Sequence, residues 1–114
     1  MGDGSFGFAV GELETAKRLS LPIIFIVISN SVYGWIKAGQ KSSFNKRYYS
    51  VDFSRTDHAR VAASYGIKTW TVKKPNELKK IISEAIKYKR GPCLIDIISQ
   101  PLEEAKAPVS EWIA

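Results

Sequence analysis

The chain has 114 residues, of which 45% are hydrophobic, so it forms one domain or part of one and is not disordered. No apolar stretch approaches the ~20 residues of a membrane-spanning helix, and no signal peptide is visible. The net charge of +6 suits an anionic partner, but the basic residues are spread along the chain, which disfavours a nucleic-acid-binding module. Cys93 is the only cysteine, so a reducing, cytoplasmic setting is expected.

The first half of the chain predicts one helix and one strand before a polar region. Residues 11–19 carry apolar side chains at helical spacing and two early glutamates, which favour a helix. Residues 23–28 are six consecutive apolar residues, mostly β-branched, which predicts a strand buried on both faces. Residues 31–40 are expected to be a loop that enters a short helix, and residues 41–50 a polar, irregular segment.

The second half predicts two more helices and two more strands. Ser54, with Asp57 three residues later, resembles the start of a helix that ends at Gly66. A strand over residues 67–72, a helix that starts at Pro75 and a strand over residues 93–98 follow.

This alternation predicts an α/β fold, an open parallel sheet with helices on both faces. In such sheets ligands bind beyond the carboxyl ends of the strands. Asn30 follows the first predicted strand, and Asp3 would follow another if a strand preceded it. Since only Met1 precedes Gly2, that strand is expected to come from another chain or to be missing from the sheet.

Asp3 and Asn30 together predict a site for a divalent metal that holds a diphosphate. The 25 residues between Gly4 and Asn30 allow one helix and one strand, which would return Asn30 to the sheet edge near Asp3. Asp3 could supply a carboxylate, Asn30 its amide oxygen and Val32 its backbone carbonyl, which are the hard ligands that Mg²⁺ prefers. The alternative is that Gly-Asp-Gly is a surface turn and that Asn30 is an ordinary turn residue after a strand.

The glycines around Asp3 suit a phosphate group. Gly2 and Gly4 would let the backbone approach the phosphate closely. Backbone N–H groups near Gly4, Ser5 and Phe6, together with the Ser5 hydroxyl, could donate hydrogen bonds to it.

These residues resemble the thiamine-diphosphate motif, in which Gly-Asp-Gly is followed about 25 to 30 residues later by Asn. The resemblance covers nearly the whole chain and points to the acetolactate synthase and benzoylformate decarboxylase group. It is carried by Gly2-Asp3-Gly4-Ser5-Phe6, Asn30-Ser31-Val32-Tyr33-Gly34-Trp35-Ile36-Lys37 and Gly91-Pro92-Cys93-Leu94-Ile95-Asp96. It implies that residues 1–114 are a partial, truncated form of the C-terminal thiamine-diphosphate-binding domain.

The resemblance also implies roles for single residues. Asp3, Asn30 and the Val32 carbonyl would ligate Mg²⁺, and Gly4 and Ser5 would contact the diphosphate. The family often has Asn-Asn where this chain has Ser-Asn, a change that keeps the metal-binding asparagine.

Residues 33–36 fall where the family covers its cofactor and substrate. Tyr33 and Gly34 match the turn over the cofactor. Trp35 and Ile36 match the wall of the substrate pocket, although for Trp35 ordinary packing is an equal alternative.

The implied function is the diphosphate- and Mg²⁺-binding portion of a 2-oxoacid decarboxylase (a lyase) or an acetolactate-synthase-like transferase. In the family the glutamate that activates the cofactor comes from a separate pyrimidine-binding domain. No segment here corresponds to that domain, so no catalytic residue is assigned and the chain alone is expected to be inactive. The expected partners are further copies of this chain or a companion chain with the pyrimidine-binding domain. The alternative is a non-catalytic folded fragment that oligomerises without binding cofactor.

The other notable side chains are expected to be structural. His58 is predicted to be exposed or to cap a helix, Cys93 to be a small core residue and Trp70 to pack on the sheet. Trp112 is expected to anchor the tail or to contact a partner.

Overall fold

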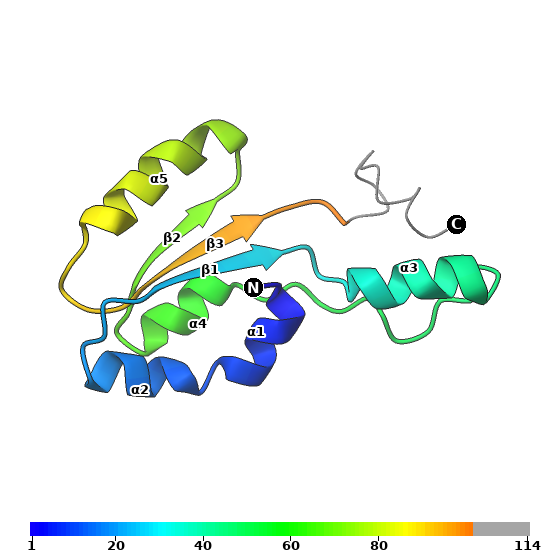
Figure 1. Cartoon of the computed structure of the whole chain (residues 1–114), viewed down its shortest axis with the longest axis horizontal. Helices are drawn as coiled ribbons and strands as arrows, with labels where there is room; N and C mark the ends of the chain where they lie inside the picture. The colour runs from blue at the N-terminus through cyan, green and yellow to red at the C-terminus, as the bar shows by residue number, and fades with distance from the viewer. Residues whose placement is uncertain (102–114) are drawn as a thin grey trace.

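A computed structural model describes residues 1–101 of the chain as a three-stranded parallel sheet with helices on both faces (Figure 1). The strand order is β1 (Ile24–Ser29), β3 (Cys93–Ile98) and β2 (Lys68–Val72), so the last strand in sequence lies in the centre. Ile26 and Trp70 both pair with Ile95, which fixes the register. The predicted open parallel α/β sheet is therefore confirmed.

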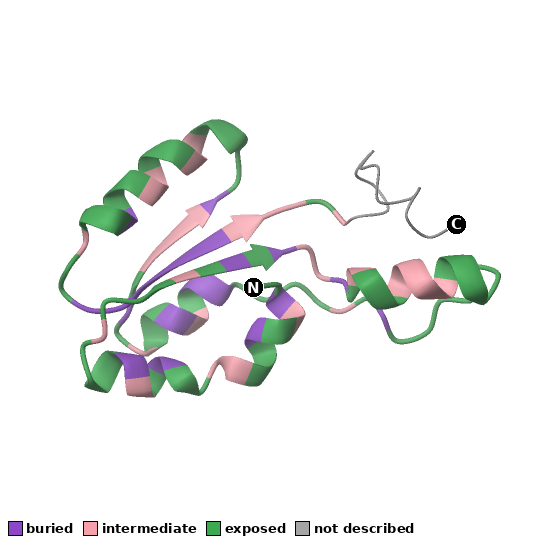
Figure 2. Cartoon of the chain, in the orientation of Figure 1, coloured by how far each residue is buried: buried purple, intermediate pink, exposed green. Residues whose placement is uncertain are grey.

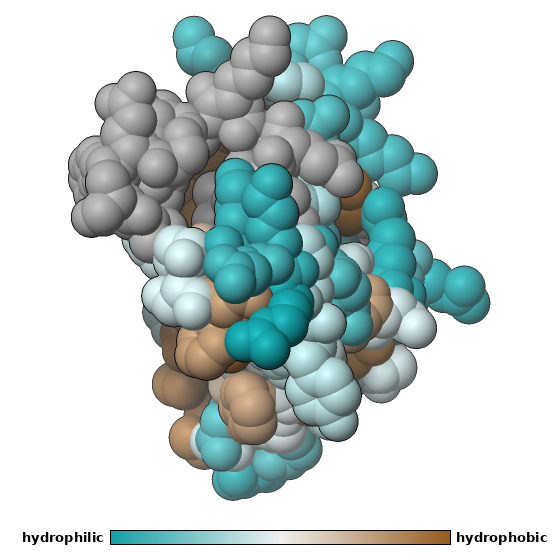
Figure 3. All heavy atoms as spheres, turned by 90° about the vertical axis from the view of Figure 1, so that its right-hand side faces the viewer, coloured by the Kyte–Doolittle hydropathy of each residue, from teal (hydrophilic) through white to brown (hydrophobic). Residues whose placement is uncertain are grey.

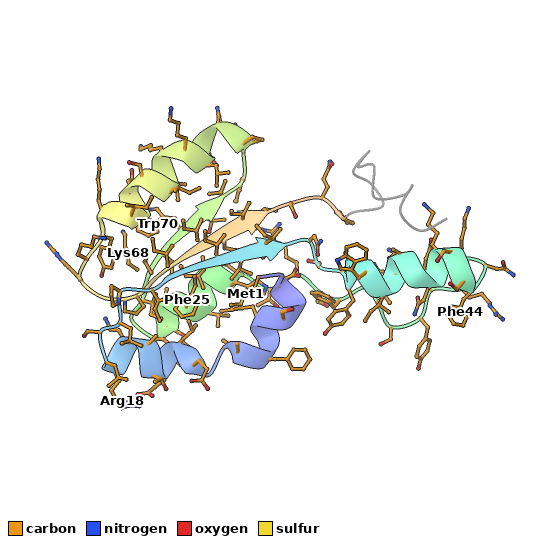
Figure 4. The ribbon with its side chains drawn as sticks, viewed as in Figure 1. Met1, Arg18, Phe25, Phe44, Lys68 and Trp70 are labelled. Carbon is orange, nitrogen blue, oxygen red and sulfur yellow. The ribbon has the colours of Figure 1, made fainter. Side chains whose placement is uncertain are left out.

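The helices form two layers and one projecting arm. On one face of the sheet lie α1 (Asp3–Ala9), α2 (Glu12–Arg18) and α4 (His58–Ser64), and on the other lies α5 (Pro75–Lys87). The remaining helix, α3 (Gly34–Ser43), extends beyond the carboxyl ends of the strands, and Phe44 lies at its far end (Figure 4). No helix within residues 1–101 is long and apolar enough to cross a membrane.

Two hydrophobic clusters hold the layers on the central strand. Leu94 points to the α1, α2 and α4 side, where it packs with Phe6, Leu13 and Val27. Ile95 points to the α5 side. Burial of this kind is the main favourable term in folding, so β3 organises the core on both faces.

The α5 side confirms two packing predictions. Cys93 is buried in this cluster, and burial raises the pKa of its thiol. Trp70 packs against the cluster, its Nε1–H donates to Glu84 at 3.1 Å, and its ring meets the Tyr88 ring edge-on.

The prediction that β1 is buried on both faces is wrong. Ile24, Ile26 and Ile28 are 37–38% exposed, whereas Val27 on the opposite face is fully buried. The reason is that α5 packs over β2 and β3, so one face of β1 stays open at the side of the sheet (Figure 2).

Among residues 1–101, the outer edge of β1 pairs only with the first two residues of the chain. Gly2 forms a parallel bridge with Ile28. The N-terminal ammonium of Met1 donates to the Ile26 carbonyl at 2.7 Å, and the Ile28 N–H donates to the Met1 carbonyl at 2.9 Å. Gly2 and Asp3 are thereby placed at the carboxyl end of β1, beside Asn30.

The helix boundaries differ from the predictions at several points. A helix at Asp3–Ala9 was not predicted, and α3 continues to Ser43, into the segment expected to be irregular. The predicted start at Ser54 is wrong because α4 begins at His58, where the Asp57 side chain accepts the Arg60 N–H at 2.9 Å. The predicted end is confirmed, since Gly66 has a φ of +74°.

The prediction that His58 is exposed or capping is also wrong. The side chain is buried, with 8% of the residue exposed, and its ring meets the Phe6 ring edge-on at 5.2 Å. Asp57 takes the capping position, and His58 packs against α1 instead. The prediction for Trp112 lies outside the described residues.

The start of α5 predicts a pH dependence of stability. The Glu77 carboxylate accepts the N–H groups of Lys73 at 2.9 Å and Lys74 at 3.0 Å, and these hydrogen bonds lower its pKa below the ordinary 4.5. The stabilisation that these two hydrogen bonds give to the folded state should be complete when the pH is above the ordinary pKa of 4.5, and it should be lost as the pH falls through the lowered pKa. We expect Glu77→Gln to lower the urea midpoint at pH 7 and to match the wild type at the acid end. A constant difference across this range would contradict the assignment.

Candidate functional site

The main site candidate among the described residues is a cleft of about 600 Å³ at the carboxyl ends of β1 and β3. It is built from the starts of α1 and α3 and from the residues that follow the two strands. Its lining residues are Gly2, Asp3, Gly4, Ser5, Ile28, Asn30, Val32, Tyr33, Gly34, Trp35, Ile36, Ser99 and Gln100. The cleft therefore brings together the two segments that the sequence singled out, around Asp3 and Asn30.

Asp3 links the start of α1 to the end of β1. Its residue is only 4% exposed. Oδ2 accepts the N–H groups of Asn30 at 3.0 Å and Ser31 at 2.7 Å, and Oδ1 accepts the Gly4 N–H at 3.0 Å. Hydrogen bonds to a carboxylate are stronger than those between neutral groups, so Asp3 holds this corner of the cleft together.

The turn after β1 is fixed by a second set of hydrogen bonds. The Asn30 Oδ1 accepts the Val32 N–H at 3.3 Å, as in an Asx turn, and Ser31 has a φ of +58°. The Ser31 carbonyl accepts the Phe53 N–H at 3.1 Å. This bond ties the turn to the segment that returns from α3.

The oxygens of Asp3, Asn30 and Val32 fit a hard divalent cation. All three residues line the cleft and offer a carboxylate, an amide and a backbone carbonyl. Each carboxylate oxygen has two lone pairs. On Asp3, both lone pairs of Oδ2 accept hydrogen bonds from the Asn30 and Ser31 amides, whereas Oδ1 accepts one hydrogen bond and keeps one lone pair. Within residues 1–101 no group of three His, Cys, Asp or Glu side chains could hold a metal.

Gly4 leaves room for an aromatic ring beside the carboxylate. A Cβ at this position would lie 2.5 Å from the Tyr33 Cε1 atom, far inside contact distance. Tyr33 in turn packs against Phe53, with 5.0 Å between ring centroids. The small residue at position 4 thus lets Tyr33 lie against the start of α1.

One of the proposed phosphate contacts, Phe6, differs from expectation. A Cβ at Gly2 would meet nothing within 4 Å, so packing does not require glycine there. Phe6 is a core residue that does not line the cleft, and its N–H donates to the Gly2 carbonyl at 2.9 Å. The amide of Phe6 is therefore not free for a phosphate, whereas Gly2, Gly4 and Ser5 do line the cleft.

The start of α3 provides an apolar wall. Trp35 is 66% exposed and Ile36 56% exposed, and both line the cleft, so Trp35 is a wall residue rather than a packed one. Figure 3 views the molecule from the side towards which α3 projects, where hydrophobic and hydrophilic side chains lie side by side at the surface. The lining of the cleft thus combines polar oxygens with exposed apolar side chains.

Sequence reasoning missed the contribution of β3 to the cleft. Ser99 and Gln100 follow this strand, and the Ser99 N–H donates to the Ser29 carbonyl at 3.0 Å. The same rule that singled out Asn30, a polar residue just after a parallel strand, could have found them.

Comparison with known proteins decides the family. The family profile described as "Thiamine pyrophosphate enzyme, C-terminal TPP binding domain" matches residues 1–97. The chain belongs to this family. The predicted resemblance to the C-terminal domain of these enzymes is thereby confirmed.

Relatives of this thiamine pyrophosphate enzyme domain include several acetolactate synthases. The chain is 36% identical over 96 residues to acetolactate synthase of Bacillus subtilis (strain 168), covering 84% of this chain and 16% of that protein. It is 28% identical over 122 residues to 2-hydroxyacyl-CoA lyase 1 of Mus musculus, and the match covers 98% of this chain and 21% of that protein.

Solved structures of the family share the fold. Benzoylformate decarboxylase from Polynucleobacter necessarius aligns with a TM-score of 0.81 at 27% identity, covering 89% of this chain and 19% of that one. The chain thus spans about a fifth of the length of the proteins it resembles.

Proposed function

We propose that the chain is the thiamine-diphosphate- and Mg²⁺-binding portion of a 2-oxoacid decarboxylase or acetolactate-synthase-like enzyme. The observation that carries this proposal is the meeting of Asp3 and Asn30 in the cleft beyond β1. Membership of the thiamine pyrophosphate enzyme family supports the cofactor. The lone Cys93, with no cysteine to pair with, supports a cytoplasmic setting.

The residues of the cleft divide into a polar and an apolar group. Asp3 through Oδ1, Asn30 through its amide oxygen and Val32 through its carbonyl would hold the cation, and the diphosphate would supply further oxygens. Gly4 and Ser5 would approach the diphosphate.

Tyr33 and Gly34 would lie against the cofactor, and Trp35 and Ile36 would face the substrate. When bound, thiamine diphosphate supplies the carbon chemistry, and the protein binds, orients and shields it.

A calorimetric titration tests this proposal. Thiamine diphosphate added to the chain with Mg²⁺ should give saturable heat, and the heat should disappear when Mg²⁺ is removed with a chelator. Mg²⁺-independent heat, or none at millimolar ligand, would reject the proposal and favour the alternative of a folded fragment that oligomerises without cofactor.

We further propose that the chain is inactive alone and works with further copies of itself or with a companion chain that carries a pyrimidine-binding domain. The chain spans about a fifth of its relatives, and β1 presents a row of exposed isoleucines beside an incompletely paired edge. Such an edge and apolar face favour association. An assay with pyruvate, thiamine diphosphate and Mg²⁺ should show no turnover, and turnover by the chain alone would contradict this proposal.

A charge on the open face of β1 should reduce association. We expect the wild type to sediment as a concentration-dependent oligomer and Ile26→Lys to shift it towards monomer. Leu19→Lys is the matched control, because Leu19 is 55% exposed at the end of α2, away from this face. A wild type that stays monomeric at all concentrations, or an equal shift in both variants, would exclude self-association through β1.

A further inference from the structure

A buried polar pair lies directly behind the cleft. The Ser29 hydroxyl donates to Oδ1 of Asp96 at 2.5 Å, and the two residues are 5% and 0% exposed. Ser29 is the last residue of β1, and Asp96 lies on β3 opposite Val27. The hydrogen bond therefore crosses between neighbouring strands at the end of the sheet where the cleft lies.

Burying the Ser29–Asp96 pair costs free energy, which suggests a role for it beyond filling space. The second carboxylate oxygen of Asp96, Oδ2, is buried without a hydrogen-bond partner among the described residues. Burying a polar group is costly, and an unsatisfied one in a folded protein needs an explanation. An apolar pair would fill the same position without that cost.

Ser29 stands immediately before the residues that hold the Asp3 carboxylate. Its side chain is tied to Asp96, and its carbonyl accepts the Ser99 N–H at 3.0 Å, so both its side chain and its backbone are anchored to β3 or its continuation. The next two N–H groups, of Asn30 and Ser31, donate to Oδ2 of Asp3.

The turn that follows needs such an anchor. Ser31 has a φ of +58°, which a residue with a side chain rarely adopts. Conformations of this kind persist where the surrounding structure fixes them from several sides. A hydrogen bond from Ser29 to the central strand fixes the residue from which this turn starts.

We propose that Ser29 and Asp96 are positioning residues for the cation site. Their hydrogen bond holds the end of β1 so that the Asn30 and Ser31 amides keep the Asp3 carboxylate, and with it the Oδ1 lone pair, in place. The effect on the cation rests on the proposed function, whereas the effect on the two amides does not. Groups that orient metal ligands typically change metal affinity about 10- to 100-fold when they are removed.

The test compares hydrogen exchange at the Asn30 and Ser31 amides in the free chain with Mg²⁺ affinity in the presence of thiamine diphosphate. Ser29→Ala should speed exchange at both amides at least about 10-fold and weaken Mg²⁺ binding about 10-fold or more. Asp96→Asn keeps an oxygen that accepts from Ser29, so both quantities should stay within about threefold of the wild type.

Val72→Ala is the control for a loss of stability alone. Val72 is buried in the α5-side cluster, away from the turn, so its truncation should destabilise the fold without singling out these two amides. If Ser29→Ala changes their exchange no more than Val72→Ala does, the positioning role is overturned. If the wild type binds no cofactor, the proposed function fails, while the exchange result still decides this inference.

Discussion

Replacing Asp3 by alanine should weaken Mg²⁺-dependent thiamine diphosphate binding by at least about 100-fold. The substitution removes a carboxylate oxygen from the proposed cation site and also the acceptor of the Asn30 and Ser31 amides. Groups that only orient a metal ligand typically change metal affinity about 10- to 100-fold when they are removed. Because Asp3 is a proposed ligand and also holds the turn that carries Asn30, its loss should reach at least the upper end of that range, as measured by calorimetric titration.

Asp52→Ala provides the matched control for charge. Asp52 is an exposed carboxylate beyond the cleft that pairs with Lys37 at 2.8 Å. The Asp52 side chain is 63% exposed and does not line the cleft, so affinity should stay within about fivefold of the wild type. If Asp3→Ala and the wild type bound thiamine diphosphate with equal affinity, Asp3 would not be part of the binding site.

A methyl group at position 4 should disrupt the cleft without removing any charge. In Gly4→Ala the new Cβ would lie 2.5 Å from Cε1 of Tyr33, and Phe53 packs behind that ring. Either the ring or the start of α1 must move, and overpacking of this kind costs about 1–3 kcal/mol. We expect a lower free energy of unfolding by that amount and about 10-fold or weaker cofactor binding, measured by denaturant unfolding and calorimetry.

Gly7→Ala is the control for Gly4→Ala within the same helix. A Cβ at Gly7 would meet nothing within 4 Å. Alanine in place of glycine in a helix stabilises by about 0.5–1 kcal/mol, so this variant should be more stable and bind normally. The clash with Tyr33 would be refuted if the two variants gained stability equally and bound cofactor alike.

The local sequence pattern predicts the strands of the sheet but not which strand faces the helices cover. Apolar runs of strand length at residues 23–28 and 93–98 predict β1 and β3, because side-chain chemistry within each run is enough to favour a strand. The exposure of Ile26 depends instead on which strands α5 covers, and that placement is decided by contacts distant in sequence.

The helices show the same division between local and distant causes. The helix α1 was missed because Gly4 and Gly7 lower helix propensity within its seven residues, and its burial of Phe6 in the core comes from tertiary packing. Ser54 and Asp57 are both suitable caps, and the chain uses the second. The burial of His58 follows from its contact with Phe6, far away in sequence.

The site was predictable to the extent that it follows from strand ends. Asp3 and Asn30 were expected to converge because ligands bind where parallel strands end, and the structure brings them together. The Ser29–Asp96 hydrogen bond was not predictable, because it depends on which strand lies next to β1 and in which register.

A crystal structure of the chain with thiamine diphosphate and Mg²⁺ tests the central claim most directly. Oxygens of Asp3, Asn30 and the Val32 carbonyl should surround one cation, each at the ~2.0–2.1 Å typical of Mg²⁺. A diphosphate bound elsewhere, or a cation that touches neither Asp3 nor Asn30, would contradict the account.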